Sequence, residues 1–248
     1  SVLLAGVLLK MGTYGFLRIS YPILPEAARW FGPYMGILAI VGIIYGGFVA
    51  FAQKDFKKMV AYSSVSHMGF VLLGLAVFTA TGLTGALLQM FNHAMITGGL
   101  FLLVGVLYDR AHTRDLDAFG GLWAKMPVYG GILVFTSLAS LGLPGLAGFV
   151  SEFMVLMGSY PVYRWMAMAA CVGILLAAAY LLYMIQRVLL GKLDPKWADL
   201  TDINKREVIT MVPLMAFILL IGVYPKIALE YMTPTIEALL GLLEVSPK

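Results

Sequence analysis

The stretch "SLGLPGLAGFVSEFMVLMG", residues 140–158, decides how this sequence is interpreted. Glycine and proline residues interrupt an apolar helical run, and a carboxylate, Glu152, follows among apolar side chains. The interruption frees backbone groups that hydrocarbon cannot satisfy, and a charge at the bilayer centre costs about 2.5–3.5 kcal/mol. Broken helices at membrane depth are enclosed by protein or line a water-filled cavity, and in transporters they mark ion sites. The stretch therefore predicts a functional site inside a membrane.

The composition supports a polytopic membrane protein. Of the 248 residues, 61% are hydrophobic and 12% are charged, whereas soluble domains have about 25% charged residues. The one cysteine, Cys171, cannot form an internal disulfide and lends no support to iron–sulfur or cysteine–zinc sites. These counts exclude a disulfide-stapled secreted fold.

Seven segments are apolar over the roughly 20 residues that cross a bilayer, which predicts an all-α fold with about seven transmembrane helices, one of them broken over 140–152. The segments are approximately 1–24, 33–52, 59–79, 82–108, 127–158, 161–190 and 208–229. The connections are too short for an extramembrane domain. We expect residues 1–230 to form one membrane domain and residues 231–248 to form a short interfacial helical tail.

The basic residues are distributed unequally between the two sides on which the connections alternate. One side carries eleven: Lys54, Lys57, Lys58, Arg110, Arg114, Lys125, Arg187, Lys192, Lys196, Lys205 and Arg206. The other side carries five: Arg18, Arg29, Arg164, Lys226 and Lys248. The positive-inside rule predicts that the first side is cytoplasmic, or the equivalent matrix or stromal face. The net charge of +4 is thereby explained without a nucleic-acid partner.

The chain begins with "SVLLAGVLL", residues 1–9, which has neither an initiating Met nor the basic region of a signal peptide. This stretch reads as the middle of a spanning helix. We therefore expect the sequence to be a C-terminal fragment of a longer protein.

Four ionisable residues are expected deep in the membrane, and they are the candidate site residues: Lys10, His67, His93 and Glu152. Each needs a polar partner, a hydrated cavity or a function, because hydrocarbon disfavours charge. Glu152 follows the start of a helix, whose free N–H groups favour a carboxylate, whereas burial favours the neutral acid. The position suits a group that binds and releases protons.

The sequence also permits purely structural roles for these four residues. Lys10 can snorkel to the interface, Glu152 can serve packing at a kink, and a purely structural His67 is as plausible as a relay histidine. Histidine titrates near physiological pH, so two histidines at membrane depth suit stepwise proton transfer. Metal binding is disfavoured, because no His, Cys or carboxylate stands three or four residues after either histidine.

Several motifs in order resemble one family. They are "LLAGVLLKMGTYGFLR", "AFAQKDFKKMVAYSSVSHMGFV", "NHAMITGGLFLLVGVLYDRAHTRDL", "GGLWAKMP" and "LGLPGLAGFVSEFMVL". Together they resemble the M-type chains of proton-pumping NADH:quinone oxidoreductase, respiratory complex I, whose mitochondrial and plastid counterpart is subunit 4. The resemblance runs from residue 2 to about residue 230.

The resemblance implies an antiporter-like fold of fourteen helices in two inverted repeats, of which this sequence would hold helices eight to fourteen. It assigns Lys10 to the lysine of helix eight, His67 and His93 to the histidines of helices ten and eleven, and Glu152 to the acidic residue of the broken helix twelve. Related L-type, N-type and sodium/proton antiporter chains mostly carry a lysine in place of Glu152, which favours the M-type interpretation.

The sequence thus predicts a proton-translocating subunit that carries protons along a line of Lys, His and Glu. We expect no redox centre in this chain; NADH, FMN, iron–sulfur clusters and quinone would bind to other subunits. The expected partners are L-type and N-type membrane subunits, the lipid bilayer and protons. The expected location is the bacterial inner membrane, or an organellar inner or thylakoid membrane.

Other functions remain as alternatives. The chain can belong to a multisubunit cation/proton antiporter or a membrane-bound hydrogenase-type complex, or it can be a scaffold whose buried charges only hold helices together. A membrane hydrolase is disfavoured, because Ser63, Ser64 and Ser66 lack a Gly-Xaa-Ser-Xaa-Gly turn.

Overall fold

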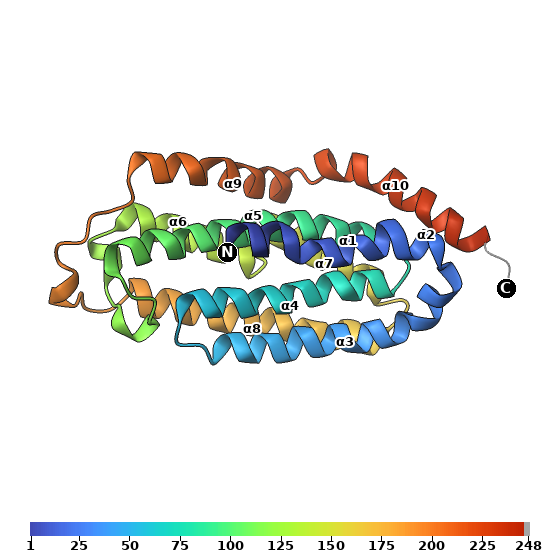
Figure 1. Ribbon diagram of the computed structural model, residues 1–248, viewed down its shortest axis with the longest axis horizontal. Helices are drawn as coiled ribbons and strands as arrows, with labels where there is room; N and C mark the ends of the chain where they lie inside the picture. Colours follow the sequence, from blue (N-terminus) through green and yellow to red (C-terminus); the bar gives the residue numbers. More distant parts are fainter. Residues whose placement is uncertain (246–248) are drawn as a thin grey trace.

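The computed structural model describes residues 1–245 as an elongated bundle of helices (Figure 1). The first span is a continuous helical run from residue 2 to residue 23 in which π-helical and α-helical turns alternate. Its parts are η1 (Leu4–Leu8), α1 (Leu9–Gly15), η2 (Phe16–Ser20) and α2 (Tyr21–Ile23). The long helices that follow are α3 (Pro25–Phe51), α4 (Phe56–Ala76), α5 (Ala80–Ala111), α8 (Arg164–Leu189), α9 (Lys205–Val223) and α10 (Lys226–Val245). The broken span consists of α6 (Pro127–Ser140) and α7 (Ala147–Ser159), and short 3₁₀ turns lie at Leu116–Ala118 (η3), Leu122–Ala124 (η4) and Pro195–Trp197 (η5).

The predicted all-α membrane fold is confirmed. Helices α3, α4, α5, α8 and α9 are each long and apolar enough to cross a bilayer. The first helical run and the pair α6 and α7 supply the other two predicted spans. Helices α4 and α5 are the most buried and lie between α3 and α8 on one side and α9 and α10 on the other (Figure 1).

The connections that carry the eleven basic residues meet at one end of the bundle, here called the basic end (Figure 1, left). Asp55 and Asp115 pair as an isolated antiparallel bridge, and the Gly121 N–H donates to the Leu190 carbonyl. Arg110 at the end of α5 binds Glu207 in the first turn of α9. The predicted grouping of these connections is therefore confirmed, and the compartment that they face stays a prediction.

The break between α6 and α7 lies where the sequence predicts it. Gly142 and Gly145 have φ angles of 82° and 92°, a left-handed conformation that only glycine adopts without steric cost. Gly148 packs so closely against the Ala139 carbonyl that a Cβ atom would collide with it. The two helix ends are thereby held against each other in the interior of the bundle.

The seventh predicted span ends earlier than its apolar pattern indicates. Helix α9 stops at Val223, and α10 starts at Lys226 directly after Pro225. Gly222 packs against Gly145 and Leu146 in the break, with no space for a Cβ atom. Lys226 therefore begins a helix beside the break, and the prediction that it lies in a connection at the opposite end is wrong. Tyr224, directly before Pro225, leaves the helical conformation with φ and ψ of −131° and 70°, since the ring of a following proline disfavours helical angles.

The predicted tail, residues 231–248, is structured as part of this same α10, as far as residue 245. Ile236 and Leu243 pack against the first span and α5. The interfacial position of the tail, and the boundary at residue 230, stay predictions.

Candidate proton-transfer site

Lys10 is buried and turned into the bundle. It lies in α1 between the two π-helical segments, and 7% of it is exposed. Its Nζ atom donates to the carbonyl of Ala5 in η1 and lies 2.7 Å from His93 Nδ1 on α5. The Ala5 carbonyl belongs to a π-helical turn, a form often found at functional sites, so Lys10 has polar partners on two elements in the interior. Lys10 therefore does not extend to the membrane interface, and the snorkelling alternative is wrong.

His93 connects Lys10 to α5. Its second ring nitrogen, Nε2, lies 3.1 Å from Thr97 Oγ1 one turn further along α5. When Lys10 carries its ammonium charge, it donates to Nδ1, so the neutral imidazole carries its proton on Nε2 and donates to Thr97. Both ring nitrogens therefore have partners that can exchange protons.

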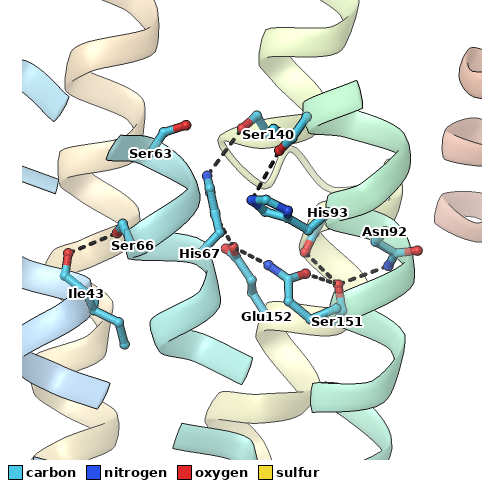
Figure 2. A network of polar contacts seen from close by, with 12 residues as sticks. Ile43, Ser63, Ser66, His67, Asn92, His93, Ser140, Ser151 and Glu152 are labelled. Carbon is cyan, nitrogen blue, oxygen red and sulfur yellow. Dashed lines mark hydrogen bonds and ion pairs between the residues drawn. The ribbon is translucent and has the colours of Figure 1, made fainter. Parts of the chain in front are cut away.

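His67 and Glu152 form a second buried pair, shown at the centre of Figure 2. His67 Nδ1 lies 2.8 Å from Glu152 Oε1, and their side chains are only 4% and 5% exposed. His67 Nε2 faces two hydroxyl groups, Ser140 Oγ at 3.2 Å and Tyr180 OH at 3.3 Å. Ser63, one turn before His67, donates to the Val60 carbonyl instead. His67 thus belongs to the same polar cluster as Glu152.

The two pairs adjoin each other across a small cavity. The imidazole centroids of His67 and His93 are 5.6 Å apart, and the rings are inclined by 57°. A cavity of about 10 Å³ lies between the pairs, close to the roughly 10–15 Å³ that one water molecule requires. Its lining consists of His67, Gln89, His93, Ile96, Ser140, Gly148 and Glu152. The structure therefore brings all four sequence-predicted residues together into one cluster.

A chain of three further polar side chains leads to Glu152, and two of them, Ser151 and Asn92, are labelled in Figure 2. Gln89 Nε2 donates to Glu152 Oε1 at 2.9 Å, and Ser151 Oγ donates to Gln89 Oε1 at 2.5 Å. Asn92 Nδ2 donates to Ser151 Oγ at 2.9 Å.

Sequence reasoning did not assign Gln89, Asn92, Thr97, Ser140 or Tyr180 to the site. The spacing of Gln89 and Thr97 could have placed them at the site, because they stand four residues before and after His93 on one helix face. No sequence pattern indicates that Tyr180 belongs there.

Metal binding was disfavoured from the sequence. Within residues 1–245, no group of three or more His, Cys, Asp or Glu side chains is placed to hold a metal ion. What the four residues offer is proton exchange between nitrogen and oxygen atoms at hydrogen-bond distance.

The chain is similar in sequence to known membrane proteins. Residues 1–178 match the family model described as the transmembrane part of NADH:quinone oxidoreductase/Mrp antiporter. The chain is 46% identical over 240 residues to NADH-quinone oxidoreductase subunit M of Rhodobacter capsulatus, covering 96% of this chain and 47% of that protein. It is 41% identical to NADH-ubiquinone oxidoreductase chain 4 of Marchantia polymorpha, covering 96% and 48%.

A solved structure gives the same result. Respiratory complex I from Thermus thermophilus with bound NADH contains a chain that superposes with a TM-score of 0.89 at 34% identity, over 95% of this chain and 50% of that chain. The present chain thus spans about half the length of the relatives that it matches.

Proposed function

Because the chain belongs to the NADH:quinone oxidoreductase/Mrp antiporter transmembrane family, we propose that it is part of a proton-translocating membrane subunit of an NADH:quinone oxidoreductase. The observation that carries the proposal is the adjacency of two buried pairs, Lys10–His93 and His67–Glu152, across a cavity of one-water size. These four residues are called the relay residues below.

We propose the following order of proton transfer along these contacts. Lys10 passes a proton to His93 Nδ1. His93 then releases the different proton that its Nε2 atom carries. Ser140 both lines the cavity and contacts His67 Nε2, so a proton that crosses the cavity enters His67 at Nε2. His67 then passes its Nδ1 proton to Glu152 Oε1. Each imidazole takes a proton on one nitrogen and releases another from the second.

Coulombic coupling between the pairs is of the required size. Two unit charges separated by the ring spacing of 5.6 Å interact by about 3 kcal/mol at an effective dielectric constant near 20. Moving one proton against a membrane potential of 150 mV costs roughly 3.5 kcal/mol. Charging one pair therefore changes the proton affinity of the other by an amount comparable to the work of one translocation step.

The redox chemistry would take place elsewhere. We propose that NADH, FMN, iron–sulfur clusters and quinone bind to other subunits, and that L-type and N-type membrane chains are neighbours of this one. The names of the bacterial and plant relatives support a multi-pass location in a bacterial inner membrane or an organellar counterpart. Pumping would require the full-length protein within its complex.

The alternative assignment is a cation/proton antiporter subunit, which the family description also includes, or a subunit of a membrane-bound hydrogenase-type complex. The curated relatives at 41–46% identity carry NADH oxidoreductase names, which favours the first assignment. An antiporter would exchange Na⁺ for protons in vesicles without NADH.

The test uses the full-length protein in its complex, in inverted membrane vesicles, with NADH-driven acidification as the readout and native gels to verify assembly. We expect Glu152→Gln and Lys10→Ala to assemble but to lose most of the acidification. The control is Glu237→Gln, which changes an exposed carboxylate on α10 and should leave pumping unchanged. Normal acidification by both relay variants would show that the buried charges serve only the structure.

A further inference from the structure

The carboxylate of Glu152 is held by a chain of buried side chains that ends on the backbone of the helix break. Gln89 and Asn92 on α5 and Ser151 on α7 are 2%, 1% and 0% exposed. Their bonds run from Ala147, the first residue of α7, to Glu152. None of the three groups carries a charge, so their contribution to a proton path depends on where their donors and acceptors point.

The bonds of this chain run in one direction, from Asn92 to Glu152. Asn92 Nδ2 has two N–H groups, which donate to the Ala147 carbonyl at 2.7 Å and to Ser151 Oγ at 2.9 Å. Since a carbonyl can only accept, the amide nitrogen of Asn92 must face Ala147. Ser151 then accepts from Asn92, and its single proton is available for Gln89 Oε1, its nearest acceptor at 2.5 Å.

The same logic fixes the amide of Gln89. Because Gln89 Oε1 accepts from Ser151, Gln89 Nε2 must face Glu152, where it donates to Oε1 at 2.9 Å. Glu152 Oε1 accepts from Gln89 on α5 and lies 2.8 Å from His67 Nδ1 on α4. The other oxygen, Oε2, lies toward Gly142 in the break, 3.6 Å from the place of a Cβ atom there.

We propose that Gln89, oriented by Asn92 and Ser151, is a positioning residue that keeps Oε1 of Glu152 toward His67 and links the carboxylate to the α6–α7 break. The inference rests on the proposed function, because it concerns the last transfer, from His67 to Glu152. Rotation of the carboxylate would break the bonds from both His67 and Gln89. A shift of α7 at Ala147 would be transmitted through Asn92, Ser151 and Gln89 to the oxygen that receives the proton.

The test compares two variants that break this chain of bonds with two matched controls. Gln89→Met removes the amide at nearly constant length, and Ser151→Ala removes only the hydroxyl. The controls are Gln53→Met, whose amide lies just after α3 and donates to the Val49 carbonyl in the last turn of α3, and Ser159→Ala, a fully buried serine of α7 that bonds to the Val155 carbonyl. All are made in the full-length protein within its complex.

Two readouts are measured: NADH-driven acidification of inverted vesicles, and the infrared difference band of the Glu152 carboxyl group, identified by its loss in Glu152→Gln. We expect Gln89→Met to shift this band and to lower pumping about tenfold, the size expected when a carboxylate loses a charge-assisted hydrogen bond. Ser151→Ala, which leaves the amide of Gln89 in place but removes its hydroxyl donor, should shift the band and lower pumping by a smaller factor. The controls should change neither readout.

A fall in pumping with an unshifted band would assign Gln89 and Ser151 a merely structural role and overturn the inference, as would wild-type behaviour of both variants. Ser151→Ala keeps the test decisive if Gln89→Met fails to assemble. If Glu152→Gln itself pumps normally, the proposed function fails, whereas the infrared shifts in the other variants still report on the hydrogen bonds to Glu152.

Discussion

Two hydrogen-bonded pairs of almost equal length occupy opposite environments in this molecule. His67 and Glu152 lie 2.8 Å apart in the interior, and Arg110 and Glu207 lie 2.7 Å apart at the basic end, with 13% and 23% of their side chains exposed. Arg110 donates to both Glu207 oxygens and to the carbonyls of Thr201 and Asp202. Because arginine keeps its proton at any physiological pH, this pair is a permanent structural tie between α5 and the chain leading into α9.

The interior pair differs because both of its members can gain or lose a proton. His67 has hydroxyl partners on its far nitrogen, and Glu152 has an amide donor on the same oxygen that meets His67. The comparison teaches that bond length does not distinguish a tie from a transfer site. What distinguishes them is whether the partners have a second protonation state and a further neighbour with which to exchange protons.

The largest expected effect is on pumping when the interior pair loses its imidazole. We expect His67→Asn to lower NADH-driven acidification about 100-fold, at the lower end of what a positioned proton-transfer group contributes, while the complex still assembles. The matched control is His112→Asn, which changes an exposed histidine in a left-handed backbone conformation that asparagine tolerates. Equal pumping by the two variants would remove His67 from the relay.

The second prediction moves the interior pair without changing its side chains. Gly148→Ala places a Cβ atom against the Ala139 carbonyl and must push α7 away from α6. We expect a loss of about 2 kcal/mol in the free energy of unfolding, within the range for overpacking, together with reduced pumping. Gly131→Ala, in α6 with open space around it among the described residues, should leave both unchanged or slightly raise the stability. Thermal unfolding of the purified complex checks the first quantity.

The third prediction addresses the tie at the basic end. Arg110→Met removes the guanidinium and leaves Glu207 partly buried without its cation, which should lower the free energy of unfolding by about 2 kcal/mol. Pumping per assembled complex should stay near the wild-type value. Arg187→Met is the control, since its 3.5 Å contact with Asp117 is about half exposed and should contribute little. A loss of pumping in Arg110→Met at full assembly would contradict a purely structural role.

The smallest expected effect concerns Asp202, next to the same tie. Its carboxylate accepts from the N–H groups of Val128 and Tyr129 in the first turn of α6, at 2.9 and 3.0 Å. Asp202→Asn keeps the shape but removes the charge and one acceptor, so we expect about 1 kcal/mol of destabilisation in the same melting experiment. Asp199→Asn, which changes an exposed carboxylate in the same connection, should have no measurable effect, and an equal loss from both would refute a capping role for Asp202.

Much of the site could be found in the sequence, because hydrocarbon makes buried ionisable groups rare enough to stand out. Lys10, His67, His93 and Glu152 were identified in this way. Their partners could not be assigned, since Lys10 and His93 are 83 residues apart and His67 and Glu152 are 85 residues apart. Tyr180 shows the limit most clearly: one tyrosine in an apolar helix gives no sign that its hydroxyl faces His67.

The seventh span shows a different limit. Its apolar residues continue past Pro225, so composition alone carries the predicted span to residue 229. The contact of Gly222 with the break and the start of α10 at Lys226 depend on neighbours that the local pattern does not contain.

The sequence by itself determined the number of spans, the position of the break and the set of ionisable residues in the interior. These properties follow from the free-energy cost of placing polar groups in hydrocarbon, which depends on each residue and its local sequence. Only the tertiary structure decided which nitrogen meets which oxygen, how Gln89 is oriented and which cavity joins the two pairs. Those choices depend on side chains from α1, α4, α5, α6, α7 and α8 that meet only when the helices pack.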